Sequence, residues 1–180
     1  MKNKAVFLDR DGTINIDFGY THKIKDLEIF PNAMEGLKLL QDSGYKRIII
    51  TNQSGIARGY FTEEDYHTFM EEMYTRLGKE GINFNGEYFC PHHPDDNCNC
   101  RKPKTGMLEQ AAEDFKLNLE KCWFVGDFKT DIECGKNAGC KTIHVLTGNR
   151  QKTAIPEADY VTKDLLEASK IIIKNEQSKI

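Results

Sequence analysis

Two acidic residues separated by one position end an apolar run near the N-terminus. In the stretch AVFLDRDGT, Asp9 and Asp11 follow four apolar residues, and Gly12 and Thr13 favour a tight turn directly after them. Two carboxylates this close repel each other, and a fold usually tolerates such a pair where a metal ion or a reaction uses both. Asp9 and Asp11 are therefore the first candidates for catalysis or metal binding.

Further polar residues end other strand-like runs. Thr51 and Asn52 close the run RIIITN, Asp127 closes CWFVGD, and Asp131 follows one helical turn later. In a sheet of parallel strands, functional groups gather beyond the carboxyl ends of the strands. Carboxylate oxygens suit Mg²⁺, which usually binds one or two carboxylates together with a substrate phosphate. The pattern predicts a phosphorylated substrate and the magnesium ligands Asp9, Asp11, Asp127 and Asp131.

Each of these residues also has a purely structural interpretation. Asp9 and Asp11 could cap a turn, and Asp131 could be an acid in the first turn of a helix, where it interacts with the helix dipole. Thr51 could be a β-branched strand residue, and Asn52 could be a turn former. The recurrence of polar ends on separate strands favours a functional site over these alternatives.

The elements that would position these residues alternate along the chain. Apolar runs typical of strands cover residues 5–9, 47–52, 87–90, 122–127, 141–148 and, as a short further strand, 158–161. Patterns typical of helices cover residues 31–44, 62–81, 105–115, 129–139 and 163–174, with Thr62 as the expected cap of the second helix. This alternation predicts an α/β fold: a Rossmann-like, mostly parallel sheet with helices on both faces and no separate cap domain.

A cluster of soft ligands lies between the third and fourth strand-like runs. The stretch CPHHPDDNCNC has the spacing C-x-H-x5-C-x-C, which matches a closed, structural Zn²⁺ site. The predicted ligands are Cys90, His92, Cys98 and Cys100, with His93 as the alternative imidazole and unpaired thiols as the alternative without metal. Since Arg101 and Lys102 follow directly, zinc would stiffen a loop that lacks a core and would aim these two side chains.

The motifs, in this order, resemble those of the haloacid-dehalogenase superfamily. They are DxDGT after the first strand, a threonine after the second, a lysine before the fourth and GDxxxD after the fourth. The resemblance implies that Asp9 attacks phosphorus and forms an aspartyl phosphate, and that Asp11 acts first as general acid and then as general base. It also implies that Thr51 and Lys102 hold the oxygens of the transferring phosphoryl group.

Within the superfamily, the stretches TNQSGIARGYF and CNCRKPKTGM resemble those of the heptose bisphosphate phosphatases. This resemblance implies a Mg²⁺-dependent phosphomonoesterase that removes the C7 phosphate of a small sugar bisphosphate. It implies substrate contacts at Asp17, Phe18, Gly19, Tyr20, Asn52, Gln53, Ser54 and Arg101. The sequence departs from the pattern at Phe128, where the family often has a lysine, and Lys129 is the candidate to replace that contact.

Two other functions stay open at this point. The short loop between the two pairs of zinc ligands resembles that of the histidinol-phosphate phosphatases. A chain of this fold that had lost its chemistry could serve as a zinc-stabilised binding module. The second alternative predicts an altered nucleophile, acid or lysine, and Asp9, Asp11 and Lys102 are all unaltered.

Chain length and net charge argue against several other classes of protein. A chain of 180 residues fits one domain, here residues 1–180 with the zinc-binding loop at about 90–100. A formal net charge of −3 offers no basic face for nucleic acid, and no apolar run approaches the roughly 20 residues that span a membrane. The N-terminus lacks the pattern of a secretion signal, so we expect a cytoplasmic protein. No predicted helix shows an apolar face beyond the one that the core requires, so we expect a monomer.

Overall fold

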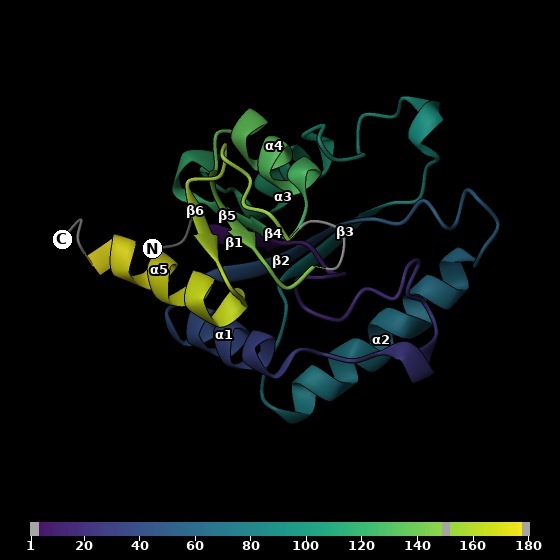
Figure 1. The fold of residues 1–180 in the computed structure, drawn as a ribbon, viewed down its shortest axis with the longest axis horizontal. Helices are drawn as coiled ribbons and strands as arrows, with labels where there is room; N and C mark the ends of the chain where they lie inside the picture. Colours follow the sequence, from purple (N-terminus) through teal and green to yellow (C-terminus); the bar gives the residue numbers. More distant parts are fainter. Residues whose placement is uncertain (1–3, 149–151, 178–180) are drawn as a thin grey trace.

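A six-stranded sheet forms the centre of the protein (Figure 1), whose computed structural model describes residues 4–148 and 152–177. The strand order is β3-β2-β1-β4-β5-β6, and every neighbouring pair is parallel. The strands are β1 (Ala5–Leu8), β2 (Lys46–Asn52), β3 (Gly86–Cys90), β4 (Trp123–Gly126), β5 (Lys141–Val145) and β6 (Tyr160–Thr162). The prediction of a parallel α/β sheet is confirmed.

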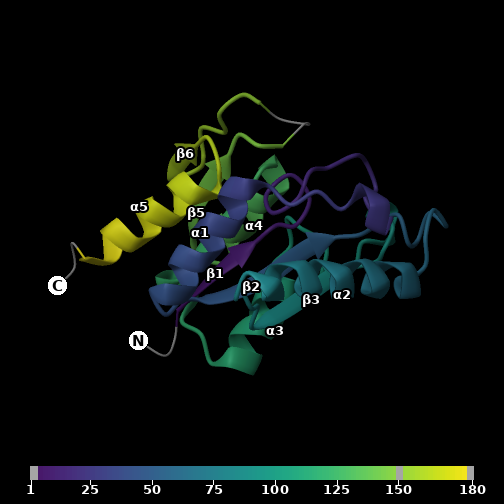
Figure 2. The same ribbon diagram turned by 90° about the horizontal axis from the view of Figure 1, so that it is seen from below.

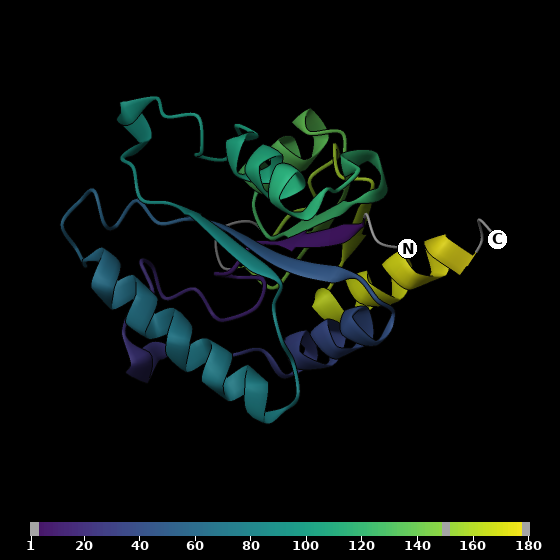
Figure 3. The same cartoon turned by 180° about the vertical axis from the view of Figure 1, so that it is seen from behind.

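Helices cover both faces of this sheet, as the sequence predicts. The first face packs against α1 (Pro31–Asp42), α2 (Glu63–Lys79) and α5 (Leu165–Gln177), and Figure 2 shows α1 and α5 side by side. The second face packs against α3 (Gly106–Phe115) and α4 (Lys129–Asn137), which lie together on the opposite side in Figure 3. No helix in the described ranges is long and apolar enough to cross a membrane.

The central strands are buried on both faces. In β1, Val6 and Leu8 belong to the core under α1, α2 and α5, whereas Ala5 and Phe7 belong to the core under α3 and α4. A strand between two layers of helices needs apolar side chains on both of its faces, which explains the unbroken run AVFL. Because β1 is packed against helices on both faces, the position of Asp9, the residue that follows it, is fixed.

The start of α2 agrees with the sequence pattern. The Thr62 hydroxyl accepts a hydrogen bond from the Asp65 N–H at 3.1 Å, and the Asp65 carboxylate accepts one from the Thr62 N–H at 2.8 Å. This capping box satisfies two backbone donors at the helix end and defines where the preceding loop stops. The expected cap at Thr62 is thereby confirmed.

Several bounds differ from the prediction. Strand β5 ends at Val145, so residues 146–148 lie beyond the strand, and β6 begins two residues later than expected. Three short 3-10 helices, Ile24–Asp26, Pro94–Asp96 and Leu119–Lys121, lie in stretches that none of the predicted helices and strands covers. Elements of one turn are too short to show a hydrophobic period, which is why the sequence pattern misses them.

Candidate active site

One cavity lies beyond the carboxyl ends of β1, β2 and β4. It gathers twelve of the residues predicted from sequence, which are Asp9, Asp11, Asp17, Tyr20, Thr51, Asn52, Gln53, Ser54, Arg101, Lys102, Asp127 and Asp131. The cavity wall also includes Arg58, Pro94, Phe128 and Thr130, and sequence reasoning did not select Arg58, Pro94 or Thr130 as site residues. The cavity therefore lies at the edge of the sheet where the polar residues at the strand ends predicted a site.

Lys102 lies at the buried floor of this cavity. Its Nζ donates to Asp9 Oδ1 at 2.7 Å and to the Ile50 carbonyl at 2.8 Å, and it pairs with Asp131 Oδ1 at 2.7 Å. Burial lowers the pKa of Lys102, but the charges of Asp131 and Asp9 outweigh burial and hold that pKa above its ordinary value. The lysine therefore carries a positive charge that the protein cannot easily remove.

Three buried carboxylates face one another beside this lysine. One oxygen from each of Asp9, Asp127 and Asp131 lies within 4.8 Å of the others. Burial, together with the charge of Asp131, raises the pKa of Asp9 to about 7 although Lys102 opposes the shift. Burial and the charges of Asp9 and Asp131 raise the pKa of Asp127 to about 9. One ammonium does not balance three carboxylates, and a hard divalent cation such as Mg²⁺ fits this oxygen set.

Asp11 is turned away from that group. Its carboxylate accepts hydrogen bonds from Arg10 Nε at 3.1 Å and Arg10 Nη2 at 2.6 Å, from Asn15 Nδ2 at 2.9 Å and from Gln53 Nε2 at 3.2 Å. Arg10 is fully buried and needs an anionic partner there. Asp11, also predicted as a Mg²⁺ ligand, is thus not among the carboxylates whose oxygens lie within 4.8 Å of one another.

The residues after β2 hold other parts of the site in place. The Gln53 side chain donates to the Thr51 hydroxyl at 2.8 Å as well as to Asp11. The Asn52 amide pairs with the backbone of Lys102, since it accepts from the Lys102 N–H at 3.1 Å and donates to the Lys102 carbonyl at 3.2 Å. Both amides were predicted as substrate contacts, and both are already engaged with catalytic candidates. The two amides therefore link residues of the cavity wall to one another.

The loop after β1 forms one wall of the cavity. Asp17 and Tyr20 line it, whereas Phe18, which is 56% exposed, and Gly19 are not part of its lining. The Gly19 N–H donates to Asp17 Oδ1 at 2.7 Å, and the Tyr20 ring meets the Tyr60 ring edge-on at 4.8 Å between centroids. The predicted substrate segment 17–20 therefore reaches the cavity through its first and last residues.

The departure at Phe128 has a clear structural outcome. The Phe128 side chain lines the cavity, and Lys129 does not. Lys129 is 54% exposed and pairs with Glu133 at 3.5 Å, one turn further along α4. Lys129 is thus not placed to replace the lysine that the family pattern has at position 128.

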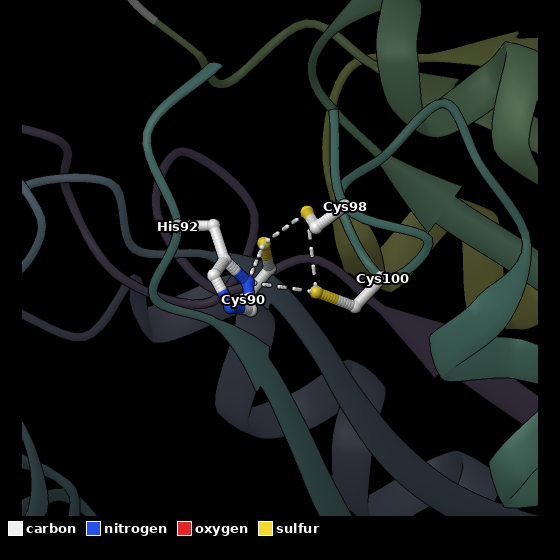
Figure 4. Close-up of side chains that lie close together, drawn as sticks. All are labelled: Cys90, His92, Cys98 and Cys100. Carbon is white, nitrogen blue, oxygen red and sulfur yellow. Dashed lines mark hydrogen bonds between the residues drawn. The ribbon is translucent and has the colours of Figure 1, made fainter. Parts of the chain in front are cut away.

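The cysteine cluster assembles around a single point (Figure 4). Cys90 Sγ lies 3.6 Å from both Cys98 Sγ and His92 Nδ1, Cys98 Sγ lies 3.4 Å from Cys100 Sγ, and His92 Nδ1 lies 3.2 Å from Cys100 Sγ. Bonds of about 2.0–2.3 Å to a tetrahedral Zn²⁺ would separate its ligand atoms by roughly 3.5–3.8 Å. The donor atoms and their spacing fit Zn²⁺ at a closed site.

The alternative ligand His93 has a different environment. Its ring Nδ1 accepts a hydrogen bond from the Asp95 backbone N–H at 3.3 Å, and the His93 backbone N–H donates to Asp96 Oδ2 at 2.7 Å. His93 therefore caps the short helix Pro94–Asp96, while His92 is the imidazole that lies among the thiols.

Comparison with known proteins agrees with this geometry. A family model described as HAD-hydrolase-like matches residues 99–168. The D-glycero-beta-D-manno-heptose-1,7-bisphosphate 7-phosphatase of Haemophilus ducreyi is 42% identical over 176 residues, covering 93% of this chain and 97% of the relative. The enzyme of the same name from Helicobacter pylori strain J99 is 47% identical over 152 residues, covering 84% of this chain and 87% of the relative.

A solved structure is similar over nearly the whole chain. The crystal structure of D,D-heptose 1,7-bisphosphate phosphatase from B. bronchiseptica, complexed with magnesium and phosphate, superposes with a TM-score of 0.88 at 30% identity. The match covers 96% of this chain and 99% of that one. The likeness therefore extends beyond the motifs to the complete fold.

The raised carboxyl pKa values predict how stability depends on pH. The pKa of Asp9, about 7, and that of Asp127, about 9, lie above their ordinary value of 3.8. Between these limits the folded state binds more protons than the unfolded state, so stability is present at low pH and is lost as pH rises. The melting temperature in Mg²⁺-free buffer should therefore fall between about pH 5 and pH 9, and saturating Mg²⁺ should reduce that fall.

The matched control is Asp127→Asn, which removes one titrating carboxyl while keeping its shape. This variant should lose less stability over the same pH range, and Mg²⁺ should restore less. A wild-type melting temperature that rises or stays constant across the range without Mg²⁺ would contradict the electrostatic description of the site.

The zinc loop predicts a coupled loss of metal and catalysis. Cys98→Ser should lower zinc content below one per chain and, by loosening the loop before Lys102, reduce kcat; a misplacement of about 1 Å can cost about 10²-fold. Lys102→Ala should cost at least as much, and the double variant should be less than additive. Elemental analysis and steady-state kinetics provide the measurements.

Cys140→Ser is the control, because Cys140 is buried outside the cluster and should leave the zinc content unchanged. A Cys98→Ser protein with a lower melting temperature, an unchanged kcat and full additivity with Lys102→Ala would show that the zinc loop only stabilises the fold.

Proposed function

The chain belongs to the family of D-glycero-D-manno-heptose-1,7-bisphosphate 7-phosphatases, and we propose that it hydrolyses the C7 phosphate of that sugar bisphosphate to leave heptose 1-phosphate. The observation that carries this proposal is the buried arrangement of Asp9 with Lys102, Asp127 and Asp131 at the floor of the cavity. This arrangement supports the proposal because phosphoryl transfer requires a nucleophile, a fixed cation and oxygen ligands for a metal around one point.

Asp9 is the proposed nucleophile. Lys102 holds Asp9 Oδ1, so Oδ2 is the oxygen left to attack phosphorus. A bond forms between this oxygen and phosphorus, the bond from phosphorus to the C7 oxygen breaks, and an aspartyl phosphate results. Lys102 and the Thr51 hydroxyl lie beside the reacting group, where they stabilise the charge on the phosphoryl oxygens.

Asp11 is the proposed acid and base. In the first step it gives a proton to the C7 alkoxide, and in the second it takes a proton from the water that attacks phosphorus and frees Asp9. The donors on Arg10, Asn15 and Gln53 hold its carboxylate at the cavity wall and away from the three-carboxylate group. This separation leaves Asp11 available for proton transfer while Asp9 reacts.

Asp9 and Asp127 are the proposed Mg²⁺ ligands of the site, and Asp131 is the third carboxylate of the group. Asp131 is already engaged by Lys102 and by the Phe128 N–H at 3.0 Å, so its main contribution is to orient the lysine. Mg²⁺, when bound, supplies positive charge that screens the carboxylates and the phosphate from each other. The Cys90, His92, Cys98 and Cys100 site holds a structural Zn²⁺ in this proposal.

Two arginines in the cavity wall support a substrate with a second phosphate. Arg58 and Arg101 both line the cavity, and neither guanidinium has a hydrogen bond or an ion pair with another residue in the described part of the chain. Arg101 Nη1 is buried and lacks a partner. Unpaired guanidinium groups favour a distal phosphate, with which they form charge-assisted hydrogen bonds, and disfavour the cationic amine of histidinol phosphate.

We also propose that residues 1–180 act as one domain, as a monomer and in the cytoplasm, on a small sugar and not on nucleic acid. The net charge of −3 supports the last point, because a nucleic-acid site would require a basic face. A test of the whole proposal is phosphate release from both anomers of heptose 1,7-bisphosphate, histidinol phosphate and an aryl phosphate. A kcat/KM about 100-fold higher, or roughly 2.7 kcal/mol, for one heptose substrate is the expected result.

The two acids after β1 should be separable by mutation. Asp9→Asn should abolish turnover, since an amide cannot attack phosphorus, and Asp11→Asn should be nearly inactive, since both half-reactions need its proton. Circular dichroism and melting temperature should confirm that both variants fold. Substantial phosphate release by a folded Asp9→Asn protein would rule out the covalent mechanism.

Arg58 should contribute to discrimination between a bisphosphate and a monophosphate. Arg58→Gln keeps much of the side-chain length but removes the charge, so kcat/KM for the bisphosphate should fall by about 10-fold or more. Activity on a small aryl monophosphate, which has no distal phosphate, should stay unchanged. Arg76→Gln is the matched control, because Arg76 pairs with Glu72 away from the cavity. Equal losses on both substrates would contradict a role in recognising the second phosphate.

A further inference from the structure

The segment that follows β5 touches the catalytic site, although none of the sequence motifs lies there. His144, inside β5, and the residues Thr147 and Gly148 just after it contact the loops that follow β4 and β1. His144 is fully buried and Gly148 is buried. His144 and Gly148 meet Asp127 itself, and Thr147 meets Gly12, which lies against the Asp127 carboxylate.

His144 holds the backbone of Asp127. Its Nε2 lies 3.1 Å from the Asp127 carbonyl oxygen, and its Nδ1 lies 3.4 Å from the Ile155 N–H. A carbonyl can only accept and a backbone N–H can only donate, so His144 is the neutral tautomer with its proton on Nε2. The ring therefore fixes the peptide of Asp127 relative to the neighbouring strand.

Gly148 leaves the space that the Asp127 carboxylate occupies. A Cβ atom on Gly148 would lie 1.9 Å from Asp127 Oδ2, and one on Gly12 would lie 2.4 Å from the same oxygen. Gly12 also has φ of +83°, which other residues rarely adopt, whereas Gly148 has no such backbone requirement. The absence of a side chain at Gly148 is thus needed for the carboxylate and not for the turn.

Thr147 ties the same segment to the catalytic loop. Its hydroxyl donates to the Gly12 carbonyl at 2.5 Å, one residue beyond Asp11. The segment therefore connects the strand end that carries Asp127 with the turn that follows the two acids. Gly12, which Thr147 holds, also lies against the Asp127 carboxylate, as Gly148 does.

We propose that His144, Thr147 and Gly148 are positioning residues, which fix the position of the Asp127 carboxylate and thereby set the affinity of the site for Mg²⁺. This inference rests on the proposed Mg²⁺ site. It goes beyond that site because these three residues offer no metal ligand and do not line the cavity. They act by fixing where one ligand oxygen lies.

The test is Mg²⁺ binding measured by isothermal titration calorimetry, without substrate. Gly148→Ala should raise the Mg²⁺ dissociation constant at least 10-fold, because the new methyl group displaces the carboxylate. Gly78→Ala is the matched control: a Cβ there meets nothing within 4 Å and the residue lies inside α2, so Mg²⁺ affinity should be unchanged.

Thr147 provides a second, milder pair. Thr147→Val has nearly the same shape but no hydroxyl and should weaken Mg²⁺ binding, whereas Thr147→Ser keeps the donor and should bind as the wild type does. Wild-type Mg²⁺ affinity in both Gly148→Ala and Thr147→Val would overturn the inference and leave the proposed function intact. A wild-type protein that binds no Mg²⁺ would overturn the proposed metal site and this inference with it.

Discussion

The charge balance of one buried lysine determines how the rest of the site is built. Lys102 is 3% exposed, and it can stay charged there only because Asp9 and Asp131 both lie 2.7 Å from its Nζ. Each partner comes from the end of a different strand or the helix after it, so the sheet must bring those ends together. Asn52 hydrogen-bonds to the Lys102 backbone, and Cys100 of the proposed zinc site lies two residues before Lys102.

The same constraint explains how two adjacent acids take different parts. Asp9 faces Lys102 and the other buried carboxylates, whereas Asp11 faces Arg10, whose fully buried guanidinium needs its own anion. The single residue between the two acids therefore does more than space them. It donates two hydrogen bonds to the Asp11 carboxylate, which supports the proposal that Asp9 attacks phosphorus while Asp11 transfers the proton.

Much of this could be predicted from the sequence, and the limits have physical causes. Unbroken apolar strands and acids at their ends indicate a parallel sheet and a site at its edge, because burial and strand direction act locally. The direction of a side chain cannot be predicted in this way. Whether Asp11 faces Mg²⁺ or Arg10 depends on how α2 packs over Arg10. Arg58 and Gly148 were missed because an arginine on a loop and a glycine after a strand have no pattern until the fold places them beside the cavity or against Asp127.

In the proposed mechanism Asp9, held by Lys102, takes the phosphoryl group before water does. The stereochemical course at phosphorus tests this most directly, with a substrate whose C7 phosphate is made chiral by oxygen isotopes and hydrolysis in isotopically labelled water. Two successive in-line displacements, one by Asp9 and one by water, predict retention of configuration in the released phosphate. Inversion would show a single displacement by water and would contradict the account.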